Sequence, residues 1–363
     1  MSQLMSQPEP SQSDKAKPLL TASVHDVRYF ASLLRGIGFS NQASMRFTAG
    51  SGITVTVEEA RTLLATSYIY ADHFDEWAFD VDNPQAAPSQ LSAPDFDRHA
   101  TSFEIPLNTL LECLNIFGTA NMSSSSSTGS KHKQWRRADD ASDDERGDDG
   151  RRPNVNRIDQ HFGGNEKRTS MRLTYAGPGY PLTLVLAEDS SGPTTTCEIS
   201  TFDSEPNLEL PFDAEQTALK IIFKSSFWLR DALSELDPSC DKITLIANPV
   251  ADVQSMQRGV PAKPLFRIQG TGAFGSTEMD YPNDREVLET FECSRSVCFS
   301  YRYAHISRTL RALQNSTKTS LRLEQEGLLS LQFLVPVPRP RGGMSDSFIE
   351  FRVRFFFSCE GRG

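Results

Sequence analysis

One order of segments occurs twice along this chain, and this internal repeat restricts the fold more than any other feature. In the first half, a helical pattern at residues 106–117 precedes strand patterns at 170–175 and 181–186. Helix, strand and strand return in the same order in the second half, at residues 307–314, 319–323 and 327–334. Self-similarity of this kind predicts two structurally similar domains within one chain.

A further helix and strand correspond near the start of each half. Residues 23–34 and 225–236 both carry apolar residues at the spacing of an amphipathic helix. Ser23 is the predicted N-cap of the first of these helices. Alternation of apolar and polar residues then predicts strands at 53–57 and 242–246. The sequence therefore predicts an α+β fold in which each domain packs two helices on an antiparallel sheet.

Two stretches are too poor in apolar residues to form a core, and we expect both to be disordered. They are an N-terminal tail at residues 1–18 and an insertion at 119–168, which holds five consecutive serines followed by a basic and an acidic cluster. The segment 203–218 is acidic and interrupted by prolines, which is typical of a connector. These boundaries predict domains at residues 19–202 and 219–358.

The predicted insertion has two possible roles besides that of a plain solvated loop. Its basic cluster, which includes Lys131 and Arg136, could serve as a nuclear-import signal. Ser142 is followed by three acidic residues, a pattern that suits an acid-directed kinase. A solvated loop explains the same composition equally well, so these alternatives stay open.

Basic residues gather on two predicted helices although the chain as a whole is acidic. A net charge of −10 argues against a surface that is basic throughout, but it allows one basic face. Arg28 and Arg35 on the first helix, and His305, Arg308 and Arg311 near residue 305, are predicted to face away from the apolar stripes. Solvated faces are the ordinary explanation. The alternative is a surface that contacts a few phosphates and binds DNA loosely, with strong salt dependence.

Signals for cofactor, metal or membrane binding are weak in this sequence. Residues 270–275 match a glycine-rich dinucleotide pattern, but a strand pattern follows instead of a helix, so we expect a glycine-rich hairpin. The six histidines are dispersed, and no two cysteines form a C-x-x-C pair. We therefore expect no metal site and no cofactor. No apolar run approaches the roughly 18 residues that cross a bilayer, so we expect no membrane partner.

An ordered set of short segments resembles one known family. The segments lie at residues 52–60, 111–118, 179–186, 234–237, 280–282 and 327–332. In this order they are similar to the Rad-one subunit of the nine-one-one DNA-damage checkpoint clamp. The resemblance runs from about Leu20 to Phe357, and the long insertion departs from it.

This resemblance implies a fold similar to that of the sliding clamp PCNA, in which three two-domain subunits close a ring around duplex DNA. It implies a non-catalytic scaffold for checkpoint signalling and repair, which acts in the nucleus without sequence preference. It also implies two partner subunits of the Rad-nine and Hus-one types, a clamp loader and a checkpoint kinase. Helices line the hole of such a ring. The candidate phosphate-facing residues are Arg28, Arg35, Arg230, Arg302, Arg308 and Arg311.

The resemblance further implies where neighbouring subunits join. In such clamps the last strand of one domain pairs with an edge strand of the neighbour's other domain, and chain order assigns these strands to residues 195–202 and 275–280. Pairing of edge-strand backbones supplies affinity, and the side chains supply partner choice. The candidate interface residues are Thr195, Cys197, Ile199, Thr201, Gly275, Thr277 and Met279.

Two other functions stay open at this point. Asp72, Asp75, Glu76 and Asp80 could bind the paired metal ions of a 3′–5′ DNA exonuclease. A solvated acidic rim is the commoner explanation, because these carboxylates lie on one predicted turn and one strand. A monomeric adaptor of similar fold that never closes a ring is the other alternative.

Overall fold

The computed structural model of the 363-residue chain describes residues 18–80, 100–118, 120, 168–188, 192–206, 208–250, 264–340 and 342–358. Apart from Pro18, the predicted tail lies outside these residues. The predicted insertion also lies outside them, apart from Ala120 and Arg168. Within the described ranges, no helix is both long and apolar enough to cross a membrane.

The first half of the chain contributes strands and two α-helices in the order predicted. Its described elements are β1 (Leu20–Val24), α1 (Val27–Gly36), β2 (Gln42–Thr48), β3 (Gly52–Glu59), β4 (Leu63–Ile69), the 3-10 turn η1 (Ala71–His73), β5 (Glu76–Phe79), β6 (Ala100–Pro106), α2 (Leu107–Leu114), β7 (Ser170–Tyr175), β8 (Leu182–Ala187) and β9 (Thr194–Ile199).

The second half repeats this order after a segment without strands. Its described elements are η4 (Ala214–Gln216), β10 (Thr217–Phe223), α3 (Phe227–Ser234), β11 (Cys240–Ala247), β12 (Phe266–Gly272), β13 (Gly275–Tyr281), β14 (Leu288–Cys293), β15 (Val297–Arg302), α5 (Tyr303–Ser307), α6 (Leu310–Asn315), β16 (Lys318–Glu324), β17 (Leu329–Pro338), β18 (Met344–Val353) and β19 (Phe357–Ser358).

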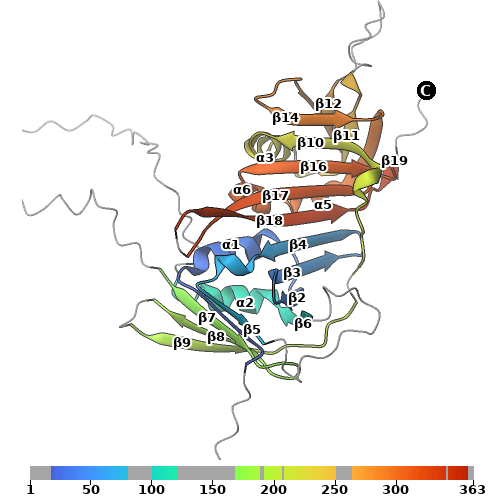
Figure 1. The fold of residues 1–363 in the computed structure, drawn as a ribbon. Helices are drawn as coiled ribbons and strands as arrows, with labels where there is room; N and C mark the ends of the chain where they lie inside the picture. Colours follow the sequence, from blue (N-terminus) through green and yellow to red (C-terminus); the bar gives the residue numbers. More distant parts are fainter. Residues whose placement is uncertain are drawn as a thin grey trace, which may run out of the picture.

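The described strands form three antiparallel sheets, and their order shows the internal repeat directly (Figure 1). In the first half the order β5-β1-β7-β8-β9 corresponds to β14-β10-β16-β17-β18 in the second. Likewise, β4-β3-β2-β6 corresponds to β13-β12-β11-β15. Strands β9 and β18 therefore hold equivalent positions, as do β13 and β4. The α+β fold of two similar halves is confirmed.

A single strand pair joins the two halves into one nine-stranded sheet. Strand β18 of the second half pairs with β4 of the first, from Phe348 opposite Tyr68 to Val353 opposite Leu63. Apolar side chains on the inner face bury the joint, and Phe351 on β18 contacts both Phe333 and Phe39, at ring-centroid distances of 5.7 and 6.1 Å. The core is consequently continuous across both halves.

The helices form a row that crosses this joint. Helix α2 contacts α1, α1 contacts α6, and α6 contacts α3, so the row extends across both halves (Figure 1). The central crossing is tight: a Cβ atom added to Gly36 would lie 2.5 Å from Ile349 Cδ1 and 3.5 Å from Ala312 Cβ. Small residues thus allow α1 and α6 to approach closely.

Two helix predictions are wrong in detail. Helix α1 begins at Val27, and its N-cap is Asp26, whose carboxylate accepts a hydrogen bond from the Arg28 backbone. The predicted cap, Ser23, instead pairs within the sheet as part of β1. The single helix predicted near residue 305 is two short helices, α5 and α6, which are separated at Arg308 and Thr309.

The glycine-rich segment forms the predicted hairpin. Strands β12 and β13 pair along their length, with Gly272 opposite Gly275 at the turn. Gly275 has a positive φ of 149°, which glycine adopts at little cost because it lacks a Cβ atom. A strand therefore follows the glycines, and the segment lacks the helix N-terminus that a dinucleotide phosphate requires.

Candidate nucleic-acid interface and edge strands

Three arginines from the two halves meet where the helix row crosses the joint. Arg35 lies near the end of α1, while Arg308 and Arg311 lie at and after the break between α5 and α6. They line one cavity of about 200 Å³ together with backbone and side-chain atoms of Gly36, Gly38, Phe39 and Ser307. The fold thus brings together basic residues that are more than 250 positions apart in the sequence, and we call this group the arginine pocket.

Within the described part of the chain, each arginine of the pocket has one polar partner residue. Arg35 Nη1 donates to the Ala120 carbonyl at 2.6 Å, and Arg311 Nη1 lies 3.5 Å from the Gly38 carbonyl. Arg308 forms an ion pair with Glu59 at 3.3 Å. Burial lowers the pKa of Arg35, but an arginine retains its charge at neutral pH. Three positive charges against one carboxylate make the pocket suitable for an anionic group.

Arg28 does not belong to this surface, contrary to the sequence-based expectation. Its side chain is 7% exposed, and its guanidinium contacts the Asp26 carboxylate through Nε at 3.0 Å and Nη2 at 2.7 Å. The buried ion pair lies at the start of α1. Because Arg28 lies away from the apolar stripe of this helix, it was expected to face solvent. His305 is also buried, at 5% exposure, so its predicted outward orientation is wrong as well.

The remaining two candidates lie outside the pocket and contact aromatic rings. Arg230 on α3 is half-buried, and its guanidinium lies 5.5 Å from the centroid of the Phe227 ring. Arg302, the exposed residue before α5, lies 4.7 Å from the Phe356 ring. Contacts of this kind are compatible with binding a phosphate, because the ring covers one face of the guanidinium only.

The two segments expected at subunit joints are edge strands of their sheets. Strand β9 is outermost in the sheet that ends β7-β8-β9, and β13 is outermost in the sheet that begins β13-β12-β11. Side chains alternate along β9. Thr195 and Cys197 are half-buried and Ile199 is 2% exposed, whereas Thr196 and Glu198 are exposed.

Strand β13 alternates between buried and exposed side chains only toward its end. Tyr281 is buried and Met279 is half-buried against the core, whereas Ser276, Glu278 and Asp280 are exposed. Gly275 and Thr277 are exposed, and Thr201, just after β9, donates to the Tyr180 carbonyl at 2.9 Å. The expected interface residues therefore alternate with an exposed acidic face that the sequence reading did not select.

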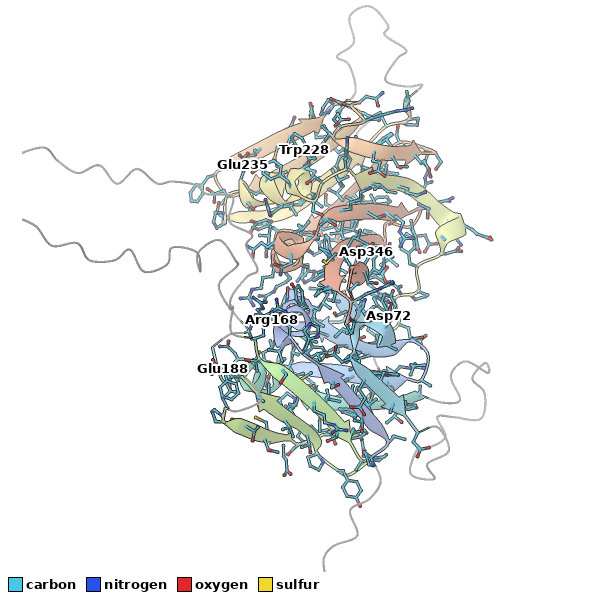
Figure 2. The ribbon with its side chains drawn as sticks, turned by 60° about the vertical axis from the view of Figure 1, so that its left-hand side comes forward. Asp72, Arg168, Glu188, Trp228, Glu235 and Asp346 are labelled. Carbon is cyan, nitrogen blue, oxygen red and sulfur yellow. The ribbon has the colours of Figure 1, made fainter. Side chains whose placement is uncertain are left out.

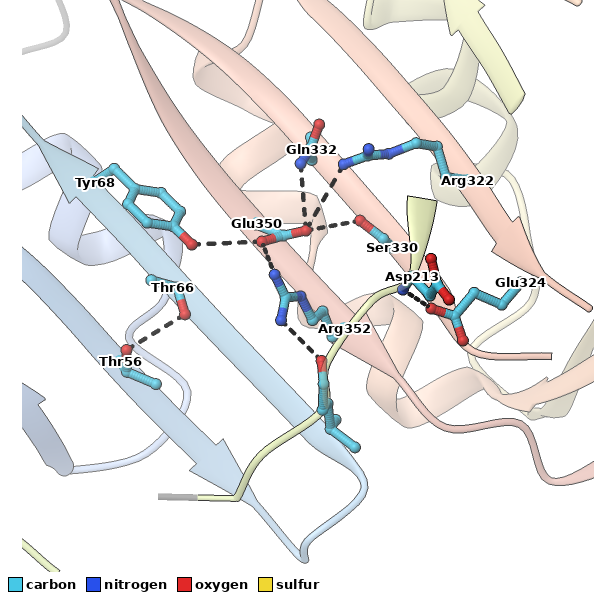
Figure 3. Close-up of polar contacts among 11 residues, drawn as sticks. Thr56, Thr66, Tyr68, Asp213, Arg322, Glu324, Ser330, Gln332, Glu350 and Arg352 are labelled. Carbon is cyan, nitrogen blue, oxygen red and sulfur yellow. Dashed lines mark hydrogen bonds and ion pairs between the residues drawn. The ribbon is translucent and has the colours of Figure 1, made fainter. Parts of the chain in front are cut away.

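Glu350 stabilises the joint between β18 and β4, and it too was missed by the sequence reading (Figure 3). Its carboxylate is 5% exposed and accepts hydrogen bonds from Ser330 Oγ at 2.8 Å, Gln332 Nε2 at 3.3 Å and Arg352 Nη2 at 2.9 Å. The Tyr68 hydroxyl of β4 lies 3.5 Å away. A glutamate within an alternating strand gives no sequence signal that distinguishes such a buried network from a solvated side chain.

The segment between the halves covers the outer side of this joint. Arg352 Nη1 donates to the Leu210 carbonyl at 2.8 Å. The side chains of Leu208 and Leu210 pack with Leu64 of β4 and with Leu328 before β17. The predicted connector is thus attached to both halves along part of its length.

Three of the four carboxylates proposed for metal binding have separate polar partners. Asp72 lies 3.2 Å from Arg339, Asp75 lies 3.1 Å from His25 Nδ1, and Glu76 lies 3.5 Å from Arg172. Asp72 lies close to the middle of the molecule, far from Trp228 on α3 and from Glu235, which follows that helix (Figure 2). Among the described residues, no group of three or more His, Cys, Asp or Glu side chains is positioned to hold a metal ion.

Comparison with known proteins is consistent with this architecture. The profile of the family described as "Repair protein Rad1/Rec1/Rad17" matches residues 19–335. The chain is 28% identical over 316 residues to the human "Cell cycle checkpoint protein RAD1", which covers 87% of this chain and 86% of the relative. It is 28% identical to the "DNA damage checkpoint control protein rad1" of Schizosaccharomyces pombe, covering 85% and 79%.

A third relative carries an enzymatic name. The "DNA repair exonuclease REC1" of Mycosarcoma maydis is 26% identical, with 87% of this chain and 88% of the relative covered. The family match spans most of the described chain and includes both halves of the repeat. We conclude that this chain belongs to the Rad1/Rec1/Rad17 family of repair proteins, whose fold is the PCNA-like clamp fold.

Proposed function

We propose that this protein is a non-catalytic subunit of a heterotrimeric checkpoint clamp that encircles duplex DNA at damaged sites. It acts there as a scaffold for checkpoint signalling and repair factors. Its partners are two other clamp subunits, of the Rad-nine and Hus-one types, and a clamp loader opens the ring. DNA is held without sequence preference, and the site of action is the nucleus.

The observation that carries this proposal is the equivalence between the joint inside the chain and its two open edges. Strand β18 pairs with β4 within the chain. The strands in equivalent positions, β9 and β13, are edges. A strand equivalent to β18 requires a partner equivalent to β4, and a neighbouring subunit can supply it. Repeating one head-to-tail joint between successive subunits produces a ring when its rotation closes, as the proposal requires for three subunits.

Contact with DNA is assigned to the helix row and, within it, to Arg35, Arg308 and Arg311. These arginines come from both halves and surround one cavity. Arg230 and Arg302 extend this basic surface, whereas the buried Arg28 is excluded from it. A surface with so few cations binds DNA loosely and loses affinity steeply as salt rises. Loose binding is what a ring that tracks along DNA requires.

The experiment that tests this function measures assembly and topological retention together. The purified chain is mixed with the other two clamp subunits, and native mass spectrometry is expected to give one copy of each. Loaded complexes are expected to remain on closed circular DNA at a salt concentration that releases them from linear DNA, since a ring slides off free ends. A chain that stays monomeric supports the adaptor alternative, and equal release from both DNA forms contradicts encirclement.

A DNA exonuclease is the second candidate, and the name of the Mycosarcoma maydis relative is the observation that favours it. This alternative assigns metal binding to Asp72, Asp75, Glu76 and Asp80. It predicts digestion of DNA by the purified protein that requires a divalent cation and is lost in Asp75→Ala. The clamp proposal predicts that highly purified wild-type protein and Asp75→Ala leave the DNA equally intact.

A further inference from the structure

The joint inside the chain provides a template for the joints at its open edges. We align the halves at the strand pairs that close equivalent turns: Tyr175–Leu182 with Leu323–Leu329, and Glu59–Leu63 with Gly272–Gly275. The strand pairings within each half then align β9 with β18 and β13 with β4. Glu198 then corresponds to Arg352, and Glu278 corresponds to Thr66. Copying the β18–β4 register places Glu198 opposite Ser276 and Thr196 opposite Glu278.

If β9 of one copy paired with β13 of another in this register, Glu198 and Glu278 would be diagonal neighbours across the strand pair, and their carboxylates would lie close together. In the internal joint, Tyr68 on β4 reaches Glu350 on β18 along the diagonal, although its direct partner is Phe348. The same diagonal leads from Glu198 to Glu278. Diagonal neighbours lie about 7–8 Å apart at their backbones, which is within reach of long side chains.

Both glutamates are exposed on the same face of the paired strands. Glu198 has Thr183 as its neighbour on β8, which offers no cation. Glu278 contacts Arg267 and accepts a hydrogen bond from Gln269 at 2.9 Å, but Arg267 is also bound by both oxygens of Asp280. The β13 face therefore has two carboxylates for one arginine. Like charges that meet across a strand pair are destabilising.

The helices beside the two edges carry acidic residues as well. Helix α2, which contacts β9, contains Glu112 and no basic residue. Helix α3 is linked to β13 by a hydrogen bond from the Tyr281 hydroxyl to the Trp228 carbonyl. It exposes Asp231 beside the half-buried Arg230, and the exposed Glu235 follows the helix. In the internal joint, α1 presents the small Gly36 to its neighbour. The two open edge strands therefore share one sign of charge, and the helix beside β9 has the same sign.

We propose that Glu198 and Glu278 select the partners of this chain by charge: they oppose pairing with a second copy, and they favour strands that carry lysine or arginine at the facing positions. This inference rests on the proposed function, because it assumes that β9 and β13 are the joining strands. It adds the register and the chemistry of the partner strands. A partner on the β9 side is expected to carry its basic residue at the position of Glu278, and a partner on the β13 side at the position of Glu198.

The test reverses each charge and follows self-association of the chain by sedimentation equilibrium at low ionic strength. Glu198→Lys and Glu278→Lys each convert the diagonal contact between copies from repulsive to attractive. Each single variant is expected to self-associate roughly threefold to tenfold more tightly than wild type. The double variant Glu198→Lys/Glu278→Lys places two lysines together and is expected to return to the wild-type level.

A matched control separates this specific contact from a general effect of net charge. Glu326→Lys changes an exposed acidic residue in the turn between β16 and β17 and is expected to behave like wild type. If net charge alone governed association, the double variant would associate most strongly, since its charge is nearest to zero. That order, or single variants that match wild type, would overturn the proposal.

The result can be distinguished from failure of the proposed function. The same variants are mixed with the two other clamp subunits, and complex formation is measured by native mass spectrometry. Selection by charge predicts that each single reversal weakens binding at its own edge only. If wild-type protein forms the normal complex but the variants self-associate as wild type does, the clamp proposal stands. Charge selection by Glu198 and Glu278 is then wrong.

Discussion

The Tyr68 hydroxyl on β4 lies 3.5 Å from the Glu350 carboxylate on β18, so a bond between two side chains adds to the backbone pairing that joins the two halves of the chain. Burial opposes ionisation of Glu350, but the Arg352 guanidinium and the hydrogen bonds from Ser330 and Gln332 outweigh it, and the pKa of Glu350 is lowered. Burial and the nearby Glu350 carboxylate raise the pKa of Tyr68. The pair is therefore a neutral donor and a charged acceptor at neutral pH.

Glu350→Gln is expected to destabilise the protein at neutral pH and to reduce its sensitivity to acid. Because the folded-state pKa lies below the ordinary value of 4.5, the stabilising contribution of the carboxylate is complete above that pH. It is lost as the pH falls through the folded-state pKa. The free energy of unfolding at pH 7 should fall by roughly 2–4 kcal/mol, because Arg352 stays partly buried without its partner.

Denaturant unfolding of wild type and Glu350→Gln between neutral and acidic pH checks this prediction. The difference between the two proteins should shrink toward low pH. A constant difference across the whole series would show that the carboxylate charge does not stabilise the joint. Glu326→Gln, in an exposed turn, provides the control for a simple change of surface charge.

His73 is expected to make the protein less stable in mild acid. Its ring is 6% exposed, and neither nitrogen has a hydrogen-bond partner among the described residues. Burial lowers the pKa of His73 below 6.5, because the charged ring would lose its hydration. The unfolded chain therefore takes up a proton first as pH falls, and the free energy of unfolding should decline below about pH 6.5. Replacement of His73 by leucine removes this contribution to the pH dependence of the free energy of unfolding.

Thermal unfolding of His73→Leu and wild type at several pH values tests the effect. The midpoint of the variant should decline less than that of wild type from pH 8 to pH 5.5. Parallel curves would mean that another group accounts for the acid sensitivity. His73 Nε2 lies 3.7 Å from Asp72, beyond hydrogen-bonding distance, so an apolar replacement should not lower stability by removing a hydrogen bond.

Gly36 should tolerate alanine but not a larger residue. The nearest atom to an added Cβ is the terminal methyl of Ile349, which can move, and the next atoms belong to Ala312 at 3.5 Å. Gly36→Ala is expected to change the free energy of unfolding by less than about 1 kcal/mol, whereas Gly36→Leu should cost roughly 1–3 kcal/mol through overpacking. Chemical denaturation compares the two, and equal stability would contradict the tight crossing of α1 and α6.

Several features of the fold were predictable from the sequence because they depend on local patterns. The alternation at residues 170–175 and 319–323 identified strands, and the repeated order identified two halves. The exact start of α1 was not predictable, because Ser23 and Asp26 are both good N-caps. Pairing of Ser23 with Glu76 and Arg172 in the sheet decides between them, and this pairing is a long-range contact.

The candidate site was only partly predictable for the same reason. Helical spacing places Arg28, Arg35, Arg308 and Arg311 away from apolar stripes, but it does not reveal what lies beside them. Arg28 is buried in an ion pair with the carboxylate of Asp26, two residues earlier in the chain. Arg35 meets Arg308 and Arg311 because β18 pairs with β4, which no local pattern specifies.

Reversing charge at Arg308 and Arg311 should weaken retention on DNA without preventing assembly. Both arginines are exposed and lie in the arginine pocket, away from the edge strands. The double variant with glutamate at both positions is expected to lose about tenfold or more in DNA affinity at moderate salt. The slope of log affinity against log salt should decrease by roughly 2, since two phosphate contacts are removed.

The control for this experiment is Arg354→Glu, which changes an exposed arginine just after β18, outside the helix row. It should retain the wild-type salt slope. Native mass spectrometry of each variant with the other clamp subunits verifies that the complex still forms. Unchanged DNA retention in the double variant would remove the arginine pocket from the DNA-binding surface.

Hydrogen–deuterium exchange identifies the strands that join neighbouring subunits, because it reports on the backbone amides of every edge strand at once. Adding the two other clamp subunits is expected to slow exchange in β9 and β13, while exchange in β5 and β14, which are also edges of their sheets, remains unchanged. Protection confined to β5 or β14, or no protection of β9 and β13 in a complex that has formed, would contradict the equivalence between the internal joint and the joints between subunits.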